Sequence, residues 1–202
     1  MNNDFIITIS RSSGSGGKEI AQLLSRELGV PFYDKELLQH AAEHSGMNPD
    51  LFEANDEKPT SSFLYSIVAG RHVDSMPLNQ KLFMAQFETI KKLANEGPCI
   101  FLGRCSDYAL RDDPRLVSVF VHAPEEHRIA KTMELYSMDE KKARAFVNKT
   151  DKNRSGYYNF YSGRRWGDID NYHLSIDTSA LGIAQSARFI IDFARCKRGG
   201  SV

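Results

Sequence analysis

The segment that most constrains the fold is the N-terminal stretch FIITISRSSGSGGKEIA, residues 5–21. Its first five residues form a short apolar run, which is typical of a parallel strand buried on both faces. A turn rich in glycine follows, and glycine permits positive φ and close approach of the backbone to another group. Apolar residues then recur at helical spacing until Gly29 and Pro31 end the pattern. The segment predicts a strand, a tight turn and a helix in immediate succession. The glycines of the turn are Gly14, Gly16 and Gly17, and the apolar helical positions are Ile20, Leu23, Leu24 and Leu28.

A turn of this kind can bind an anion, because successive N–H groups converge and the helix adds its positive dipole end. Compared with the P-loop consensus GxxxxGK(S/T), Gly17 and Lys18 match, but Ser12 replaces the first glycine and Glu19 replaces the hydroxyl that ligates Mg²⁺. A serine of the turn could supply that hydroxyl instead, and the sequence does not choose among Ser10, Ser12, Ser13 and Ser15. The alternative is a glycine-rich turn with an exposed lysine and no ligand.

Composition narrows the class of protein. The 202 residues suffice for one α/β domain spanning 1–202 with a small helical lid. Lys and Arg total 26 and so do Asp and Glu, so no net positive field attracts nucleic acid. No apolar run reaches membrane-spanning length and no signal-type segment opens the chain, so a cytoplasmic location is the default expectation. The three cysteines lack metal or disulfide spacing, which favours buried free thiols at Cys99, Cys105 and Cys196.

Strand and helix patterns alternate along the chain, which predicts βαβ units and a parallel sheet of about five strands. The helical patterns predict an acceptor-side helical region within 56–97, although 56–77 resembles a loop, and a lid within 139–170. The expected strands are Phe5–Ile9, Val30–Tyr33, Cys99–Leu102, Leu116–Val121 and Leu174–Ile176. The expected later helices are Lys35–His44, Leu78–Asn95, Pro124–Tyr136, Asp139–Asn153 and Ile183–Arg195.

Two polar residues follow expected strands, at the edge where parallel sheets place their chemistry. Asp34 comes after Val30–Tyr33, and Arg104 follows Gly103 at the end of Cys99–Leu102. A carboxylate here could accept a hydrogen bond from a substrate hydroxyl, and a guanidinium could bind a phosphate in bidentate fashion. The structural alternatives are a helix cap for Asp34 and a surface ion pair for Arg104.

A basic and aromatic stretch near residue 150 is the candidate lid. Phosphoryl transfer needs cations that close over the transferring group and exclude water. Tyrosines and Trp166 crowd the same stretch, and packing is the expected role of most of them. The basic residues are Lys149, Lys152, Arg154, Arg164 and Arg165.

The chain resembles the cytidylate kinase-like family of P-loop nucleotide kinases, through ITISRSSGSGGKEIA, LGVPFYDKELL, FLGRCSDY and GYYNFYSGRRWGDIDNYHLSIDTSALG in the expected order. The resemblance implies a three-layer α/β/α P-loop fold with a five-stranded parallel sheet, ATP as donor, Mg²⁺, and a nucleoside monophosphate as acceptor. It also implies that Arg104 contacts the acceptor and that Asp34 lines its site. The donor phosphates would be held by Arg11, Gly14, Ser15, Gly16, Gly17 and Lys18.

The expected chemistry is in-line transfer of the γ-phosphoryl group, with Lys18, Lys152 and Arg154 as the catalytic cations. The lid departs from the family string Arg-Asp-Arg-Asn-Arg, because Thr150 and Lys152 replace two arginines. An acidic family position also falls at Tyr172, so cytidine specificity is not implied. The Mg²⁺ ligand and the oligomeric state are not identified.

Two other classes of function remain open. Glu19 and the altered lid are also consistent with a module that binds a nucleotide but does not catalyse phosphoryl transfer. His40, Glu43 and His44 form HxxEH on an expected helix, a pattern that supplies zinc ligands and a base in some peptidases. Because such a short motif matches by chance, the peptidase is the remote alternative.

Overall fold

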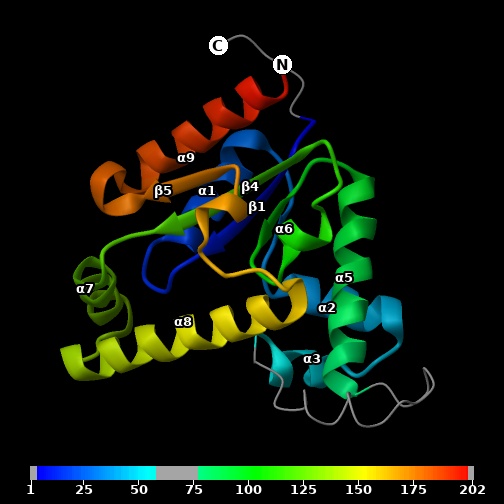
Figure 1. The fold of residues 1–202 in the computed structure, drawn as a ribbon, viewed down its shortest axis with the longest axis horizontal. Helices are drawn as coiled ribbons and strands as arrows, with labels where there is room; N and C mark the ends of the chain where they lie inside the picture. The colour runs from blue at the N-terminus through cyan, green and yellow to red at the C-terminus, as the bar shows by residue number, and fades with distance from the viewer. Residues whose placement is uncertain (1–3, 58–76, 200–202) are drawn as a thin grey trace.

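The computed structural model describes residues 4–57 and 77–199. Their centre is a five-stranded parallel sheet in the order β2-β3-β1-β4-β5, as predicted (Figure 1). The edge strand β2 keeps only two residues of the expected Val30–Tyr33. The strands are β1 (Ile6–Arg11), β2 (Phe32–Tyr33), β3 (Ile100–Leu102), β4 (Leu116–His122) and β5 (Leu174–Asp177).

Helices cover both faces of the sheet, which confirms the three-layer architecture (Figure 1). Successive side chains of β1 point to opposite faces of the sheet. On one face, Ile7 and Ile9 pack with α1 (Gly17–Leu28) and α9 (Thr178–Lys197). Ile6 points the other way, toward α2 (Glu36–Ser45) and α5 (Leu78–Glu96). Because helices cover both faces of the sheet, β1 can be mostly apolar along its length. Six residues of β1 pair with β4, and Arg11 pairs with Val121, so the turn after Arg11 lies beside the end of β4.

The predicted lid region, residues 139–170, consists mainly of α8 (Glu140–Ser162), which pairs with α7 (Glu125–Tyr136) in a helical hairpin, called the lid hairpin below. In Figure 1, α8 lies across the end of the sheet at which β1 and β4 finish. The expected helix end at Asn153 is wrong, because α8 continues to Ser162. Tyr157 and Tyr158 are buried in a cluster with Phe83 and other aromatics, which confirms the expected packing role of these tyrosines.

Smaller differences concern short elements and cysteines. Two helices were not predicted: α3 (Pro49–Asn55), which Asn48 caps, and the four-residue α6 (Ser106–Ala109). Helix α9 begins before the expected Ile183 and is interrupted at Gly182. All three cysteines are free, but Cys196 is exposed rather than buried. Of the expected loop at 56–77, residues 58–76 lie outside the described part of the chain.

No helix in the described ranges is long and apolar enough to span a membrane.

Candidate active site

The turn between β1 and α1 has the geometry of an anion-binding loop. Gly14 and Gly16 have φ values of 78° and 85°, the left-handed region that glycine enters without strain. A Cβ on Gly14 would lie 2.5 Å from the carbonyl oxygen of Arg128, and a Cβ on Gly17 would lie 2.6 Å from Cβ of Arg11. Gly16 also forms the N-cap of α1 without a side chain to cap the first turn. The first-turn amides of α1 are therefore left for an anion at the positive end of the helix.

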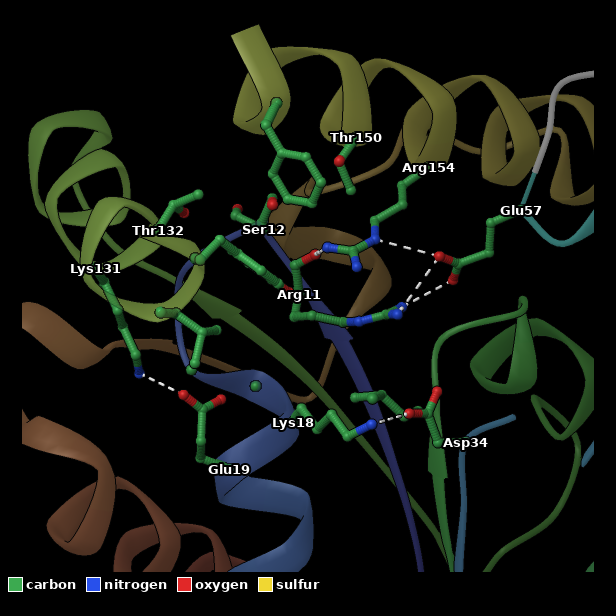
Figure 2. Close-up of a pocket in the computed structure, with 18 of the residues that line it drawn as sticks. Arg11, Ser12, Lys18, Glu19, Asp34, Glu57, Lys131, Thr132, Thr150 and Arg154 are labelled. Atoms are coloured by element: carbon green, nitrogen blue, oxygen red, sulfur yellow. Dashed lines mark hydrogen bonds and ion pairs between the residues drawn. The ribbon is translucent and has the colours of Figure 1, made fainter. Parts of the chain in front are cut away.

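This loop forms the floor of a cavity of about 500 Å³ (Figure 2). The opposite walls come from the lid hairpin, from the ends of β2 and β3, and from the two residues after α3. Most sequence-predicted site residues line this one cavity, although they come from four separate segments of the chain. They are Arg11, Gly14, Gly16, Gly17, Lys18, Asp34, Arg104 and Arg154.

Ser15 and Lys152 are not among the lining residues. The Ser15 hydroxyl is buried and donates to the carbonyl oxygens of Ser12 and Val121, at 2.8 and 3.0 Å. It fixes the loop to the end of β4 and is not available for Mg²⁺. Lys152 is exposed on α8, whereas Thr150 of the same helix does line the cavity.

Lys18 projects into the cavity and forms an ion pair with Asp34. Its Nζ lies 2.8 Å from Asp34 Oδ2, and 55% of the lysine side chain is exposed. This hydrogen bond raises the pKa of Lys18. Burial alone would raise the pKa of Asp34, but Lys18 and Arg104 outweigh it, so the pKa is lowered. The carboxylate does not cap α2, whose N-cap is Lys35. The pair joins the loop to the sheet edge where we expected an acceptor.

Arg104 is the most enclosed charge of the site, with 2% of its side chain exposed. It donates to both carboxylate oxygens of Asp56, at 3.0 and 2.9 Å, and to Asp34 at 3.4 Å. The alternative hypothesis that Arg104 forms an ion pair on the protein surface is therefore wrong. Gly103, Arg104 and Cys105 all have positive φ, between 55° and 72°. Such backbone strain in a non-glycine residue persists only where surrounding contacts hold it, and it gathers at functional sites.

Glu57 joins Arg11 to Arg154 across the cavity (Figure 2). Its carboxylate accepts from Arg11 Nη1 at 2.8 Å and from Arg154 Nε at 3.2 Å. Burial by itself raises the pKa of Glu57, but Arg11 and Arg154 outweigh burial and hold the pKa well below its ordinary value. Burial and the neighbouring Arg11 also lower the pKa of Arg154. Two adjacent, partly buried guanidinium groups require an anion between them, and in this structure Glu57 supplies it.

This arrangement predicts a pH dependence of stability. The pKa of Glu57 in the folded protein lies below its ordinary value of 4.5. Its ion pairs therefore contribute their full stability above about pH 5. This contribution is lost as the pH falls from there toward the lowered pKa of the folded protein. We expect the free energy of unfolding to fall more steeply with decreasing pH in the wild type than in Glu57→Gln, as measured by urea unfolding across the acid range. Glu53→Gln, an exposed change on α3, is the control. Parallel curves for the wild type and Glu57→Gln would contradict the assignment.

The lid is attached to the anion-binding loop by Asp151. One oxygen of Asp151 accepts from the Ser13 N–H at 2.7 Å, and the other binds Arg128 at 2.6 Å. Arg128 also donates to the Ser13 carbonyl oxygen at 3.0 Å, so both backbone groups of Ser13 are held. Asp151 thus fixes the loop from α8, a role that no local sequence pattern indicates.

Glu19 forms an ion pair with Lys131 of α7 at 2.8 Å (Figure 2). In the described residues, no group of three His, Cys, Asp or Glu side chains is arranged to hold a metal ion. Mg²⁺ does not need such a cage in phosphoryl-transfer sites, where one or two carboxylates and substrate phosphates bind it. Glu19 lines the cavity and pairs with Lys131 through Oε1, whereas both oxygens of Asp34 already contact Lys18 or Arg104. The donor set therefore fits Mg²⁺ held mainly by a bound polyphosphate.

The HxxEH residues lie outside the cavity. His40 Nδ1 is 3.7 Å from Glu43, and the rings of His40 and His44 are 6.4 Å apart. Both ring nitrogens of His44 already have partners, Thr89 at 3.4 Å and Lys92 at 2.9 Å. This geometry does not favour a zinc site.

Comparisons with known proteins agree with the fold. No curated protein sequence matches the chain. A crystal structure of an uncharacterized protein from Eubacterium ventriosum ATCC 27560 shares 28% identity and a TM-score of 0.72, over 94% of this chain and 98% of that one. The shikimate kinase of Bacteroides thetaiotaomicron matches at 12% identity and TM-score 0.53, over 95% and 96% of the two chains. A gluconokinase from Sinorhizobium meliloti 1021 matches at 15% identity and TM-score 0.51, over 98% and 93%.

The two kinases establish the P-loop kinase fold. The sequence profile of the cytidylate kinase-like family matches residues 6–180, most of the chain. Together with the glycine loop, Lys18 and the arginines around one cavity, this match shows that the chain belongs to the cytidylate kinase-like family.

Proposed function

We propose that the protein transfers the γ-phosphoryl group of ATP to a small acceptor that carries a phosphate, such as a nucleoside monophosphate. The observation that supports this most directly is the pairing of three cavity arginines with carboxylates. Arg11, Arg104 and Arg154 bind Asp56 and Glu57 with the contacts that a phosphate would make. Beside them lies the glycine loop with Lys18. One cavity thus offers an anion nest for a donor and a guanidinium cluster for an acceptor.

The proposed reaction needs no protein nucleophile. The amides at the start of α1 cradle the donor phosphates, and Lys18 neutralises the charge that develops during transfer. Arg154 reaches from the lid over the loop, where its Nη1 donates to the Arg11 carbonyl oxygen at 3.2 Å. In this proposal Asp34, which is bound to Lys18, faces the acceptor. Bound Mg²⁺ would supply charge neutralisation of the donor phosphates, with Glu19 as its candidate protein ligand.

A nucleotide-binding module without turnover is the second candidate. Two observations favour it: Arg104 already uses most of its donors on Asp34, Asp56 and the Leu102 carbonyl oxygen, and Glu19 stands where P-loops carry a hydroxyl and is itself paired. A module would bind ATP through the same loop but would release no ADP with any acceptor.

An acceptor screen separates the two candidates. We expect ADP release from ATP and Mg²⁺, measured in a coupled assay, with at least one member of a panel of nucleoside monophosphates. Shikimate and gluconate are included as acceptors that lack a phosphate. Thermal stabilisation by ATP, measured in parallel, reports binding without turnover. Stabilisation by ATP without ADP release for any acceptor would favour the module, and release only with an acceptor that lacks a phosphate would contradict the proposed acceptor class.

A further inference from the structure

Two aromatic side chains line the cavity on the lid side. Tyr136 is the last residue of α7 and Phe146 lies in α8, with ring centroids 5.3 Å apart and an angle of 48° between the planes. Half of Tyr136 is exposed, at 51%, and its neighbour Leu135 is exposed at 63%. Large apolar side chains held open at a cavity wall are a marker of ligand contact.

The hairpin does not need this pair for its own packing. Ile129, Ala143 and Val147 form the buried core between α7 and α8, with Met133 and Met138 against them. Neither Tyr136 nor Phe146 belongs to that cluster. The two rings therefore extend the apolar surface of the hairpin into the cavity rather than into the protein.

The α7 side of the cavity lies across Lys18 from Asp34 and Glu57. Figure 2 shows Lys131 and Thr132 of α7 on one side of Lys18, with Asp34 and Glu57 on the other. Tyr136 follows Lys131 on the same helix by little more than one turn. A nucleoside triphosphate is a linear chain, so its γ-phosphate must point toward the acceptor while its base lies at the opposite end. With the acceptor beside Asp34, the base falls on the α7 side.

We propose that Tyr136 and Phe146 form the stacking platform for the base of the donor nucleotide. This inference rests on the proposed function, because it requires a nucleoside triphosphate in the glycine loop. Stacking of a base on an aromatic ring is worth about 1–3 kcal/mol per base, which corresponds to roughly a fivefold to 150-fold change in affinity at about 1.4 kcal/mol per factor of ten. Tyr136 and Phe146 would therefore determine the affinity for the donor nucleotide without contacting the reacting atoms.

Calorimetric titration of the full chain tests the platform with two probes. ATP carries the base, and inorganic tripolyphosphate carries only the phosphates. We expect the double variant Tyr136→Ala, Phe146→Ala to bind ATP at least about tenfold more weakly than the wild type, with tripolyphosphate affinity unchanged. Phe189→Ala, which removes an equally exposed ring from α9, should leave both affinities unchanged. The melting temperature of each variant confirms that it is folded.

The possible results separate the two proposals. Unchanged ATP affinity in the double variant, or an equal loss for ATP and tripolyphosphate, would overturn the platform. Absence of ATP binding to the wild type would instead contradict the proposed function. Where tripolyphosphate binds too weakly to measure, the ethenoadenine analogue of ATP decides. Its fluorescence should be quenched on binding to the wild type and not on binding to the double variant, and equal signals from both proteins would overturn the platform.

Discussion

Replacing Lys18 by alanine should lower the turnover number by about a hundredfold to a thousandfold, the usual loss when one preorganised charge-stabilising donor is removed. The lysine lies at the start of α1, beside the loop that would hold the phosphates, and more than half of its side chain is exposed. Its removal should therefore affect the transition state far more than the fold. ADP release with the best acceptor from the screen measures the effect, and the melting temperature reports the fold.

The control for this prediction is Lys91→Ala. Lys91 is an exposed lysine of α5 that pairs with Glu88 on the same helix and does not line the cavity. It removes the same charge and the same side-chain length from the protein. A turnover number for Lys18→Ala within a few-fold of this control, in a folded protein, would mean that Lys18 does not act on the transferring group.

The sheet and the glycine loop could be predicted because their signals are local. The apolar run of β1 and the glycines after it specify strand, turn and helix within 17 residues, without knowledge of any distant contact. The C-terminal end of α1 also follows a local rule, because Gly29 has a φ of 66° and its N–H donates to the Ser25 carbonyl oxygen. Helices and strands whose apolar residues follow one regular spacing, and which end at a clear stop signal, were therefore predicted with small errors in their bounds.

The ion pairs of the site could not be predicted because their partners are distant in sequence. Glu57 lies 46 residues from Arg11 and 97 from Arg154, and Asp151 lies 138 residues from Ser13. A carboxylate in a polar stretch carries no local sign of which cation it will meet in the fold. The same limit explains why Lys152 was chosen beside Arg154, although only Arg154 points into the cavity.

The end of α8 was misjudged because tertiary packing outweighs local preference. Gly156 and the tyrosines after it lower the intrinsic helix propensity, which favoured an end near Asn153. In the structure Tyr158 donates to Asp107 at 2.7 Å, and Phe83 stacks on Tyr161 at 3.9 Å. These contacts bind the last turns of α8 to α5 and α6 and stabilise them as helix.

The second large effect concerns stability. We expect Arg104→Met to destabilise the protein by about 3–5 kcal/mol, the cost of removing one partner from a buried ion pair. Methionine keeps an unbranched side chain of similar length, so the main loss is the charge. Asp56 would lose both of its hydrogen bonds to the guanidinium, and Asp34 would lose one of its two cationic partners. Urea unfolding of the wild type and the variant measures the difference.

Two further variants show whether burial is the cause. Adding Asp56→Asn to Arg104→Met removes the carboxylate that the first change leaves unpaired, so the double variant should recover part of the lost stability. Arg144→Ala breaks ion pairs with three carboxylates, those of Glu125, Glu126 and Glu140, yet it should change stability far less. Since Arg144 is well exposed and Arg104 is not, equal losses at the two positions would show that the enclosure of Arg104 does not determine its contribution. In that case the ion pairs of Arg104 with Asp34 and Asp56 would not be what stabilises the empty cavity.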